Sequence, residues 1–409
     1  VGVDINEQIL ETLRSGGLHI HEPGLRSLVE AALRSGNLNV SDKPEEADAF
    51  IIAVPTPFYT DQNGEYNGKS YKLADMRAVK SAAQAIVPVL RKGNLVVLES
   101  TSPPLTTKDL VAPILEESGL KAGIDFHLAY SPERVLPGQI LRELIENARV
   151  IGGVTPQSSR AGHDLYAIFV KGEIILTDAT TAEMVKLMEN TSRDINIAIA
   201  NEFSRLSDRF GIDVWDAISI ANRHPRVKIL NPGPGVGGHC ISVDPWFFVE
   251  SAPDLSQLIY TARQVNDAQP HFVMELTKKA LGDLKGKNIT ALGLAYKPDV
   301  DDLRESPAID VVRLLQAAGA LVKCYEPFKP EANLPGINIE LELEAALSGV
   351  DGVILLVNHK VLCDINPIDM AALTSGRILI DTVNGWNGKD WEASGFSMFK
   401  LGVNQKGSG

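Results

Sequence analysis

One order of strands and helices occurs twice in this chain, once in each terminal part. The buried strand in "EEADAFIIAVP" (45–55) has a counterpart in "SGVDGVILLVN" (348–358), and "KGNLVVLESTS" (92–102) has one in "SGRILIDTVNG" (375–385). Strands that alternate with helical patterns predict a parallel sheet covered by helices on both faces. The repeat therefore predicts two Rossmann-like, doubly wound halves.

The stretch between the two halves has no strand signals. Its main feature is "TTAEMVKLMENTSRDINIAIANEFSRLSDRFG", which contains no proline or glycine before Gly211 and so predicts one long helix. The predicted fold class is α/β, with two Rossmann-like parallel-sheet domains joined by this helix and a small all-helical domain. We expect the boundaries to be 1–178, 179–285 and 286–402, followed by a flexible tail at 403–409.

Composition excludes several classes of protein. The net charge of the 409 residues is −13, without acidic blocks, which disfavours nucleic-acid binding. The longest apolar runs are too short to cross a bilayer, so we expect no membrane span. The three cysteines are far apart and form no C-x-x-C pair, which disfavours a zinc site or a disulfide framework. We therefore expect no metal, and a cytoplasmic location.

The loop "NPGPGVGGHCISVDP" (231–245) is the segment most suggestive of chemistry. Its glycines permit positive φ and let a ligand approach the backbone, although an ordinary surface turn is the alternative. Cys240 ends the glycine-rich part, and Asp244 follows four residues later. A thiol near a cation can act as a nucleophile, and an acid beside it can position water. Cys324 and Cys363, by contrast, are expected to be small buried side chains.

Other polar residues stand where α/β enzymes place functional groups. Lys186 and Asn190 are spaced i, i+4 on the long helix, so they share a face. That face is either solvated or offers donors to a developing oxyanion. Candidates at the carboxyl ends of predicted strands are Thr101, Glu133, Arg134, Lys297 and Arg304.

An acid also ends the strand expected at the start of the sequence, in "VGVDIN". Such an acid holds a ribose hydroxyl of NAD in a Rossmann half, so Asp4 is a candidate for that contact, with a plain turn residue as the alternative. A G-x-G-x-x-G turn precedes this acid by about 20 residues in Rossmann halves. The chain begins at Val1, so we expect this turn to be missing, together with the strand that precedes it and opens a complete Rossmann half.

An ordered set of motifs resembles the UDP-sugar 6-dehydrogenase family, which includes the UDP-glucose and GDP-mannose dehydrogenases. The motifs are "EST", "PER..PG", "RVIGG", "AEMVKLMEN", "PGPGVGGHC..D", "GLAYKPDVDDLRESP" and "DTVNG", spread over essentially the whole chain. The segment "NRHPRVKILNPGPGVGGHCISVDPWF" is most similar to the UDP-N-acetyl-D-mannosamine branch of the family. "STSPPLTT" departs from the pattern, because Leu105 stands where relatives often have glycine.

The resemblance implies a role for each matching residue. Cys240 matches the nucleophile, and the other catalytic positions are Lys186, Asn190, Asp244, Glu133 and Thr101. Cofactor-side positions are Asp4, Pro55, Thr56, Thr101 and Arg304. Substrate-side positions are Glu133, Arg134, Lys186, Asn190, Gly237, Lys297 and Arg226, the last reaching across a subunit interface. The first domain would then bind NAD, the middle domain would form a homodimer through the long helix, and the last domain would bind the UDP-sugar.

The activity that the resemblance implies is a four-electron oxidation. NAD-dependent oxidation of UDP-N-acetyl-D-mannosamine at C6 would give the uronate through a thiohemiacetal and a thioester on Cys240. Two alternatives stay open. The same chemistry would act on UDP-N-acetylglucosamine or UDP-glucose, or the chain would be an inactive sugar-nucleotide-binding protein without the NAD glycine turn.

Overall fold

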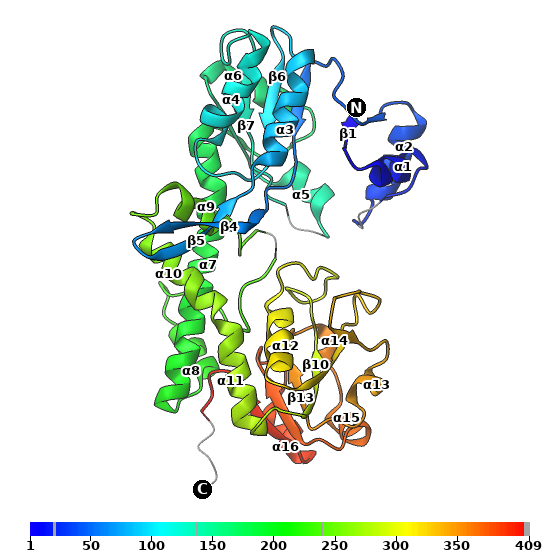
Figure 1. Cartoon of the computed structure of the whole chain (residues 1–409), viewed down its shortest axis with the longest axis vertical. Coiled ribbons are helices and arrows are strands. Elements are labelled where there is room, and N and C mark those ends of the chain that lie inside the picture. Colours follow the sequence, from blue (N-terminus) through cyan, green and yellow to red (C-terminus); the bar gives the residue numbers. More distant parts are fainter. Residues whose placement is uncertain (19–21, 136–137, 239, 405–409) are drawn as a thin grey trace. The chain divides into compact units, whose positions relative to one another are not determined.

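Runs of valine, leucine and isoleucine form the strands in both halves of the chain, as the repeat predicts. The computed structural model describes residues 1–18, 22–135, 138–238 and 240–404. These residues form two units (Figure 1). The first consists of Val1–Glu189 with Trp246–Leu255, and the second of Asn190–Pro245 with the residues from Ser256 onward. The tail expected at 403–409 lies outside the described residues from 405 onward.

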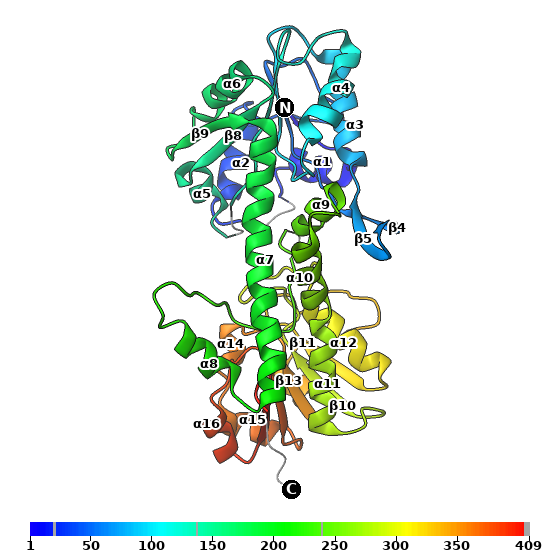
Figure 2. The same cartoon turned by 90° about the vertical axis from the view of Figure 1, so that its left-hand side faces the viewer.

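The first unit is built on a five-stranded sheet with the order β3-β6-β7-β8-β9. Its strands are β3 (Ala49–Ile52), β6 (Leu95–Leu98), β7 (His127–Tyr130), β8 (Arg149–Gly153) and β9 (Ile174–Asp178). Helices α3 (Arg77–Ile86) and α4 (Ala112–Leu115) pack on one face, and α6 (Pro156–Tyr166) packs on the other (Figure 2). One pairing differs from the expected parallel sheet, because β8 runs antiparallel to β7.

The first residues do not join this sheet, contrary to the expected strand "VGVDIN". Within the described residues, β1 (Gly2–Val3) pairs only with β2 (Val40–Ser41), beside α1 (Glu7–Arg14) and α2 (Leu25–Arg34). Val3 is exposed, so β1 buries no apolar face that would set its register in a larger sheet.

A hairpin that the repeat does not predict follows β3. Strands β4 (Phe58–Tyr66) and β5 (Lys69–Ala74) pair antiparallel. The turn between them is Asn67-Gly68, where both residues have positive φ, as a two-residue hairpin turn requires.

The second unit contains a six-stranded sheet in which every pair of strands is parallel, with the order β12-β11-β10-β13-β14-β15. The strands are β10 (Asn288–Leu292), β11 (Leu321–Tyr325), β12 (Asn338–Ile339), β13 (Gly352–Leu355), β14 (Ile378–Asp381) and β15 (Ser397–Lys400). Helices α11 (Gln269–Leu281) and α12 (Pro307–Ala317) pack on one face. The other face is covered by α13 (Leu343–Leu347), α14 (Lys360–Cys363), α15 (Pro367–Leu373) and α16 (Gly388–Ala393).

The long helix is confirmed. It is α7 (Ala179–Phe210), 32 residues in length, and Figure 2 shows its full course. The remaining helices are α5 (Ile140–Glu146), α8 (Val214–Ala221), α9 (Asp244–Ser251) and α10 (Gln257–Asp267). In the part of the chain that the structure describes, no helix combines the length and apolar character needed to cross a membrane.

Candidate functional site

The glycine-rich loop packs tightly against the segment that follows β10. A Cβ at Gly237 would lie 2.4 Å from the carbonyl oxygen of Glu305, and one at Gly238 would lie 2.7 Å from the Tyr296 ring. Gly238 also has a φ of +86°, and its N–H donates to the carbonyl of Arg304 at 3.3 Å. These glycines are therefore required for close packing within the second unit, a reason that the sequence analysis did not consider.

Cys240 is exposed at the end of this loop. Burial raises the pKa of the Tyr296 hydroxyl, and the charges of Asp302 and Cys240 raise it further. The hydrogen bonds that Arg304 donates to the Asp302 carboxylate raise the pKa of Arg304, and the charge of Cys240 also contributes to this rise. The thiol therefore lies within electrostatic reach of the Arg304 guanidinium. Arg304 itself is held by the Asp302 carboxylate, with Nη2 to Oδ2 at 2.6 Å.

The other two cysteines have different surroundings. Cys324 is fully buried, as expected, and burial raises its pKa to about 12. Cys363 is half-buried, and burial raises its pKa to about 11. Both thiols therefore stay protonated near neutral pH.

The segment containing Cys240 is joined to α7 at both ends. At one end the N–H of Gly233 donates to Oδ1 of Asn201 at 2.9 Å. At the other end Nδ2 of Asn190 donates to Oδ2 of Asp244, whose own N–H donates to the carbonyl of Cys240 at 2.9 Å. The structure thus brings together Asn190, Asp244 and the chain around Cys240, three of the sequence-predicted positions.

Glu133 and Lys186 come together in the first unit. Burial raises the pKa of Glu133, while the N–H of Val135 and the charge of Lys186 oppose this shift. Lys186 is itself buried. The neighbouring Arg134 does not join them, because its Nη2 pairs with Oε1 of Glu189 at 2.6 Å.

A second set of charges lies near Glu133, and the sequence analysis missed it. The carboxylate of Glu99 accepts hydrogen bonds from Arg149 and from the hydroxyl of Tyr166, and Arg149 Nε donates to Oγ of Ser131 at 2.9 Å. Glu99 raises the pKa of Glu133 and Arg149 lowers it. The signal was present, because Glu99 opens "EST" and Arg149 opens "RVIGG".

The cofactor-side candidates Thr56 and Thr101 meet at the carboxyl ends of β3 and β6. Oγ1 of Thr56 donates to the carbonyl of Thr101 at 2.7 Å, and Pro55 precedes it, exposed. These uncharged groups at the carboxyl edge fit the nicotinamide end of a dinucleotide. Asp4 follows β1, and its Oδ1 accepts the N–H of Asn6 at 2.8 Å, so it also makes a local turn.

The segment after Thr101 is anchored to α7. Leu105 has a φ of +74°, and its N–H donates to Oε2 of Glu183 at 2.7 Å. The N–H and hydroxyl of Thr107 donate to Oε1 of the same carboxylate at 2.7 and 2.6 Å. The buried Glu183 therefore fixes a turn whose backbone suits glycine better than leucine.

Two predicted substrate contacts remain, Arg226 and Lys297. Arg226 is exposed in the segment after α8. The ammonium of Lys297 lies 5.8 Å from the ring centroid of Tyr296, which places it on the segment that packs against the glycine-rich loop.

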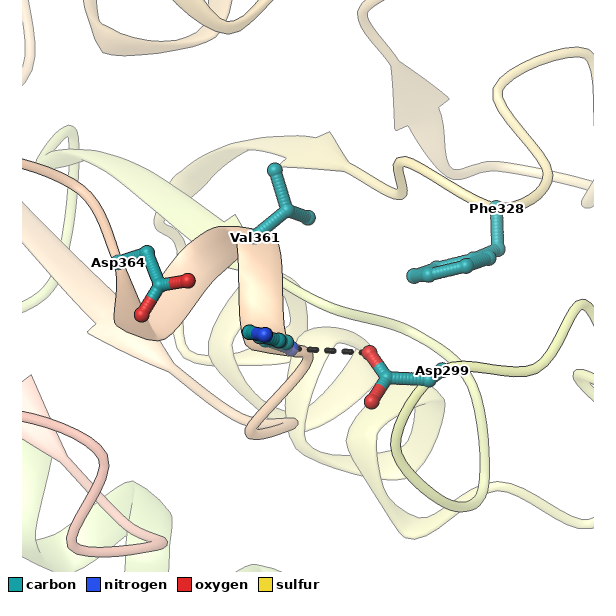
Figure 3. A pocket seen from close by; sticks show the side chains of 5 residues that line it. Asp299, Phe328, Val361 and Asp364 are labelled. Atoms are coloured by element: carbon teal, nitrogen blue, oxygen red, sulfur yellow. Dashed lines mark hydrogen bonds between the residues drawn. The ribbon is translucent and has the colours of Figure 1, made fainter.

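A cavity of about 560 Å³ opens in the second unit at the carboxyl ends of β10, β11 and β13 (Figure 3). None of the sequence-predicted site residues lines it; its walls are Asp299, Phe328, Lys360, Val361 and Asp364. Asp299 accepts the N–H of Lys360 at 2.9 Å.

The acid that ends β11 is enclosed beside this cavity. Oε2 of Glu326 accepts the N–H groups of Leu294 and Ala295 at 2.7 and 3.0 Å, and it lies 3.2 Å from Nε2 of His359. Burial opposes its ionisation, but hydrogen bonds, first that from His359, outweigh this and keep its pKa below the ordinary value.

Three family models match the chain in sequence order. They describe the NAD binding domain (residues 1–170), the central domain (180–268) and the UDP binding domain (290–388) of the UDP-glucose/GDP-mannose dehydrogenase family. The chain belongs to this family. It is an NAD-dependent UDP-sugar dehydrogenase, which confirms the resemblance, the fold class and the cofactor.

Individual relatives in the family cover nearly the same length. An NDP-N-acetyl-D-galactosaminuronic acid dehydrogenase of Ralstonia solanacearum is 49% identical, over 95% of this chain and 91% of that protein. A UDP-N-acetyl-D-mannosamine dehydrogenase of Campylobacter jejuni is 48% identical, over 88% and 89%. The solved structure of a UDP-D-ManNAc dehydrogenase from Pyrococcus horikoshii has a TM-score of 0.88 at 37% identity, covering 98% of this chain and 93% of that one.

Proposed function

We propose that this dehydrogenase oxidises C6 of UDP-N-acetyl-D-mannosamine to the carboxylate, through a covalent intermediate on Cys240. The observation that carries the proposal is an exposed thiol on a closely packed loop, near Arg304, with Asn190 bonded to Asp244 at the end of the loop. Relatives named for this sugar, at 44–48% identity, support the substrate.

In the first oxidation, C6 of the sugar becomes an aldehyde. When bound, NAD supplies the hydride acceptor, and one NAD is consumed in each of the two oxidations. Lys186, or a water that it polarises, takes the proton of the C6 hydroxyl. Thr56 and Thr101 would hold the nicotinamide side of the cofactor, and Asp4 would hold its ribose.

Cys240 then captures the aldehyde. Its thiolate forms a C–S bond to C6, and the carbonyl oxygen becomes the alkoxide of a thiohemiacetal, stabilised by donors from Lys186 and Asn190. This tetrahedral carbon carries a hydrogen that leaves as hydride in the second oxidation, which gives a thioester. Capture also retains a reactive aldehyde on the protein between the two oxidations.

Hydrolysis completes the reaction. A water attacks the thioester carbonyl and loses a proton to Glu133 or Asp244, after which the C–S bond breaks and the thiolate leaves. Burial raises the pKa of Glu133, which makes its carboxylate a stronger base than an ordinary glutamate.

The covalent route is tested with Cys240→Ser. We expect formation of the uronate to fall by about 10³-fold or more, because the thiol is the group that carries the sugar. Cys363→Ser is the matched control, and it should keep wild-type rates. Uronate formation by Cys240→Ser at the wild-type rate would refute the intermediate.

A second substrate is favoured by one comparison. The relative from Ralstonia solanacearum is named for an N-acetylgalactosamine derivative and is as similar as the mannosamine relatives. Side-by-side kcat/KM on the UDP derivatives of N-acetylmannosamine, N-acetylgalactosamine, N-acetylglucosamine and glucose decides between them. We expect the highest value for N-acetylmannosamine, and a higher value for another sugar overturns that choice.

We further propose a homodimer formed through α7. Four exposed apolar side chains lie on it at positions i, i+4, i+7 and i+11, namely Ile199, Phe203, Leu206 and Phe210. This spacing forms one stripe along a helix, typical of a face that packs against another helix. A second copy of the same helix presents the same stripe, which suits a two-fold interface.

We place the reaction in the cytoplasm. The cytoplasm keeps thiols reduced, which suits an enzyme whose nucleophile is a thiol. Cys240, Cys324 and Cys363 are all present as thiols in the structure.

A further inference from the structure

We infer that Asn201 is a positioning residue for Cys240, acting through a directed chain of side-chain amides. The inference rests on the proposed role of Cys240. Asn201 is fully buried in α7, and it accepts the N–H of Gly233 at the start of the glycine-rich loop. Neither the motifs nor the repeat singles it out.

The orientation of each amide in the chain is fixed by backbone groups at its two ends. The Gly233 N–H can only donate, so the group of Asn201 that faces it must be the oxygen. Nδ2 of Asn201 then points to Oδ1 of Asn266 at 2.9 Å. Nδ2 of Asn266 in turn donates to the carbonyl of Asp194 at 3.0 Å, and a carbonyl can only accept. Reversing either amide would place two donors or two acceptors face to face.

The series of hydrogen-bonded amides ends at an ion pair between Asp194 and Arg263. Oδ1 of Asp194 also accepts from Nδ2 of Asn266 at 2.8 Å and from Nη1 of Arg263 at 2.6 Å. All four side chains are at most 2% exposed, so water cannot replace a missing partner cheaply. The series of amides therefore holds Oδ1 of Asn201 in a fixed position toward the N–H of Gly233.

The position of this contact explains what it does. Asn201 fixes the start of the segment, and Asn190 fixes its end through Asp244, eleven residues apart on one helix. With both ends attached to α7, the backbone between them, including Cys240, is positioned relative to Asn190. Releasing one end lets the thiol move relative to the donors, and a misplacement of about 1 Å is enough to lower rates about 100-fold.

The first test is Asn201→Ala, with Asn196→Ala as the matched control on the same helix. The amide of Asn196 donates within its own helix, to the carbonyl of Ser192 at 2.6 Å. We expect Asn201→Ala to lower kcat by about 10–100-fold while KM changes less than about threefold, and the control to match wild type. Equal kcat in both variants would overturn the inference.

The second test leaves the buried amides intact. Gly233→Pro removes the N–H that Asn201 accepts, whereas Gly233→Ala keeps it, and a Cβ at this position meets open space. We expect Gly233→Pro to reproduce the kcat loss and Gly233→Ala to avoid it. This pair keeps the inference testable if Asn201→Ala fails to fold, and equal rates for the two variants would contradict it.

Hydrogen exchange provides a readout that is independent of catalysis. Pro232 and Pro234 have no N–H, so the Gly233 amide is resolved readily in a peptide spanning 231–236. Its exchange should be at least about tenfold faster in Asn201→Ala than in wild type. Unchanged exchange would overturn the role of Asn201. If exchange accelerates but Cys240→Ser still makes uronate at the wild-type rate, the proposed function is wrong while the contact is real.

Discussion

Individual side chains in the site take their properties from neighbours that are remote in sequence. Glu133 is a candidate base whose pKa is raised first by burial, then shifted by Lys186, Glu99 and Arg149. Glu99 and Arg149 belong to other segments of the same unit and are not among the proposed catalytic or substrate-binding residues. The pH dependence of the enzyme should therefore respond to residues outside the proposed catalytic set.

Replacing Glu99 with glutamine tests this at the level of one carboxylate. The change removes a negative charge that raises the pKa of Glu133 and leaves the positive charge of Arg149 uncompensated, and both effects lower that pKa. A base works when deprotonated, so the acidic limb of the kcat–pH profile should move to lower pH. The measurement is kcat against pH for both proteins. A limb that moves to higher pH would show that Glu133 is not the group that titrates there.

The residue scale also shows what one sequence can reveal. Asp244 and Asn190 could be proposed from spacing and motif, and the structure joins them. Asn201 could not be proposed in this way, because its role depends on the backbone N–H that it accepts from Gly233, 32 residues away in the sequence. A buried asparagine on a long helix has the same local sequence pattern whether it binds a loop or a water.

At the scale of elements, the turn after β6 contains a strained residue, Leu105, and is hydrogen-bonded to the buried Glu183 of α7. Leu105 adopts a left-handed backbone conformation, which costs a leucine roughly 1–2 kcal/mol. Leu105→Gly removes this strain, and the greater freedom of glycine in the unfolded chain offsets part of the gain. We expect the midpoint of thermal unfolding to rise by about 1–2 °C, measured by calorimetry. A fall would mean that side-chain contacts of the half-exposed Leu105 outweigh the strain.

The glycine-rich loop gives a second prediction at this scale. In Gly237→Ala the added methyl group would meet the carbonyl of Glu305 at 2.4 Å, so the loop must move away from the segment after β10. We expect kcat to fall about 10–100-fold, because Cys240 moves with the loop. Gly233→Ala, which meets no atom within 4 Å, is the control. Similar kcat values in the two variants would show that close packing here is dispensable.

Sequence patterns predicted the presence of helices and strands better than the structure at their ends. The run without proline or glycine gave α7, and the paired motifs gave β3, β6, β13 and β14. The repeat did not predict the β4–β5 hairpin, although Asn67-Gly68 is a strong local turn signal. Ser306 occupies the N-cap position of α12, a place where serine commonly caps a helix, but its hydroxyl makes no capping hydrogen bond. The backbone conformation at a cap depends on the preceding loop, which periodicity does not describe.

For the whole molecule, the apolar stripe on α7 predicts how copies associate. Phe203→Glu places a charge in the middle of the stripe, which a helix–helix interface would have to desolvate. We expect a dimer for the wild type and a monomer for the variant at micromolar concentration, measured by sedimentation velocity. Glu202→Gln, on an exposed neighbouring position, should remain dimeric. A dimer in both variants would place the interface elsewhere.

The two sheets differ in a way that the repeat alone does not show. The acid that ends β11 accepts backbone N–H groups of the segment after β10, and His359 closes over it. A ribose could bind the same carboxylate only after these internal hydrogen bonds were broken. Converting this sheet into a second dinucleotide site would therefore require changes to buried residues as well as to surface residues.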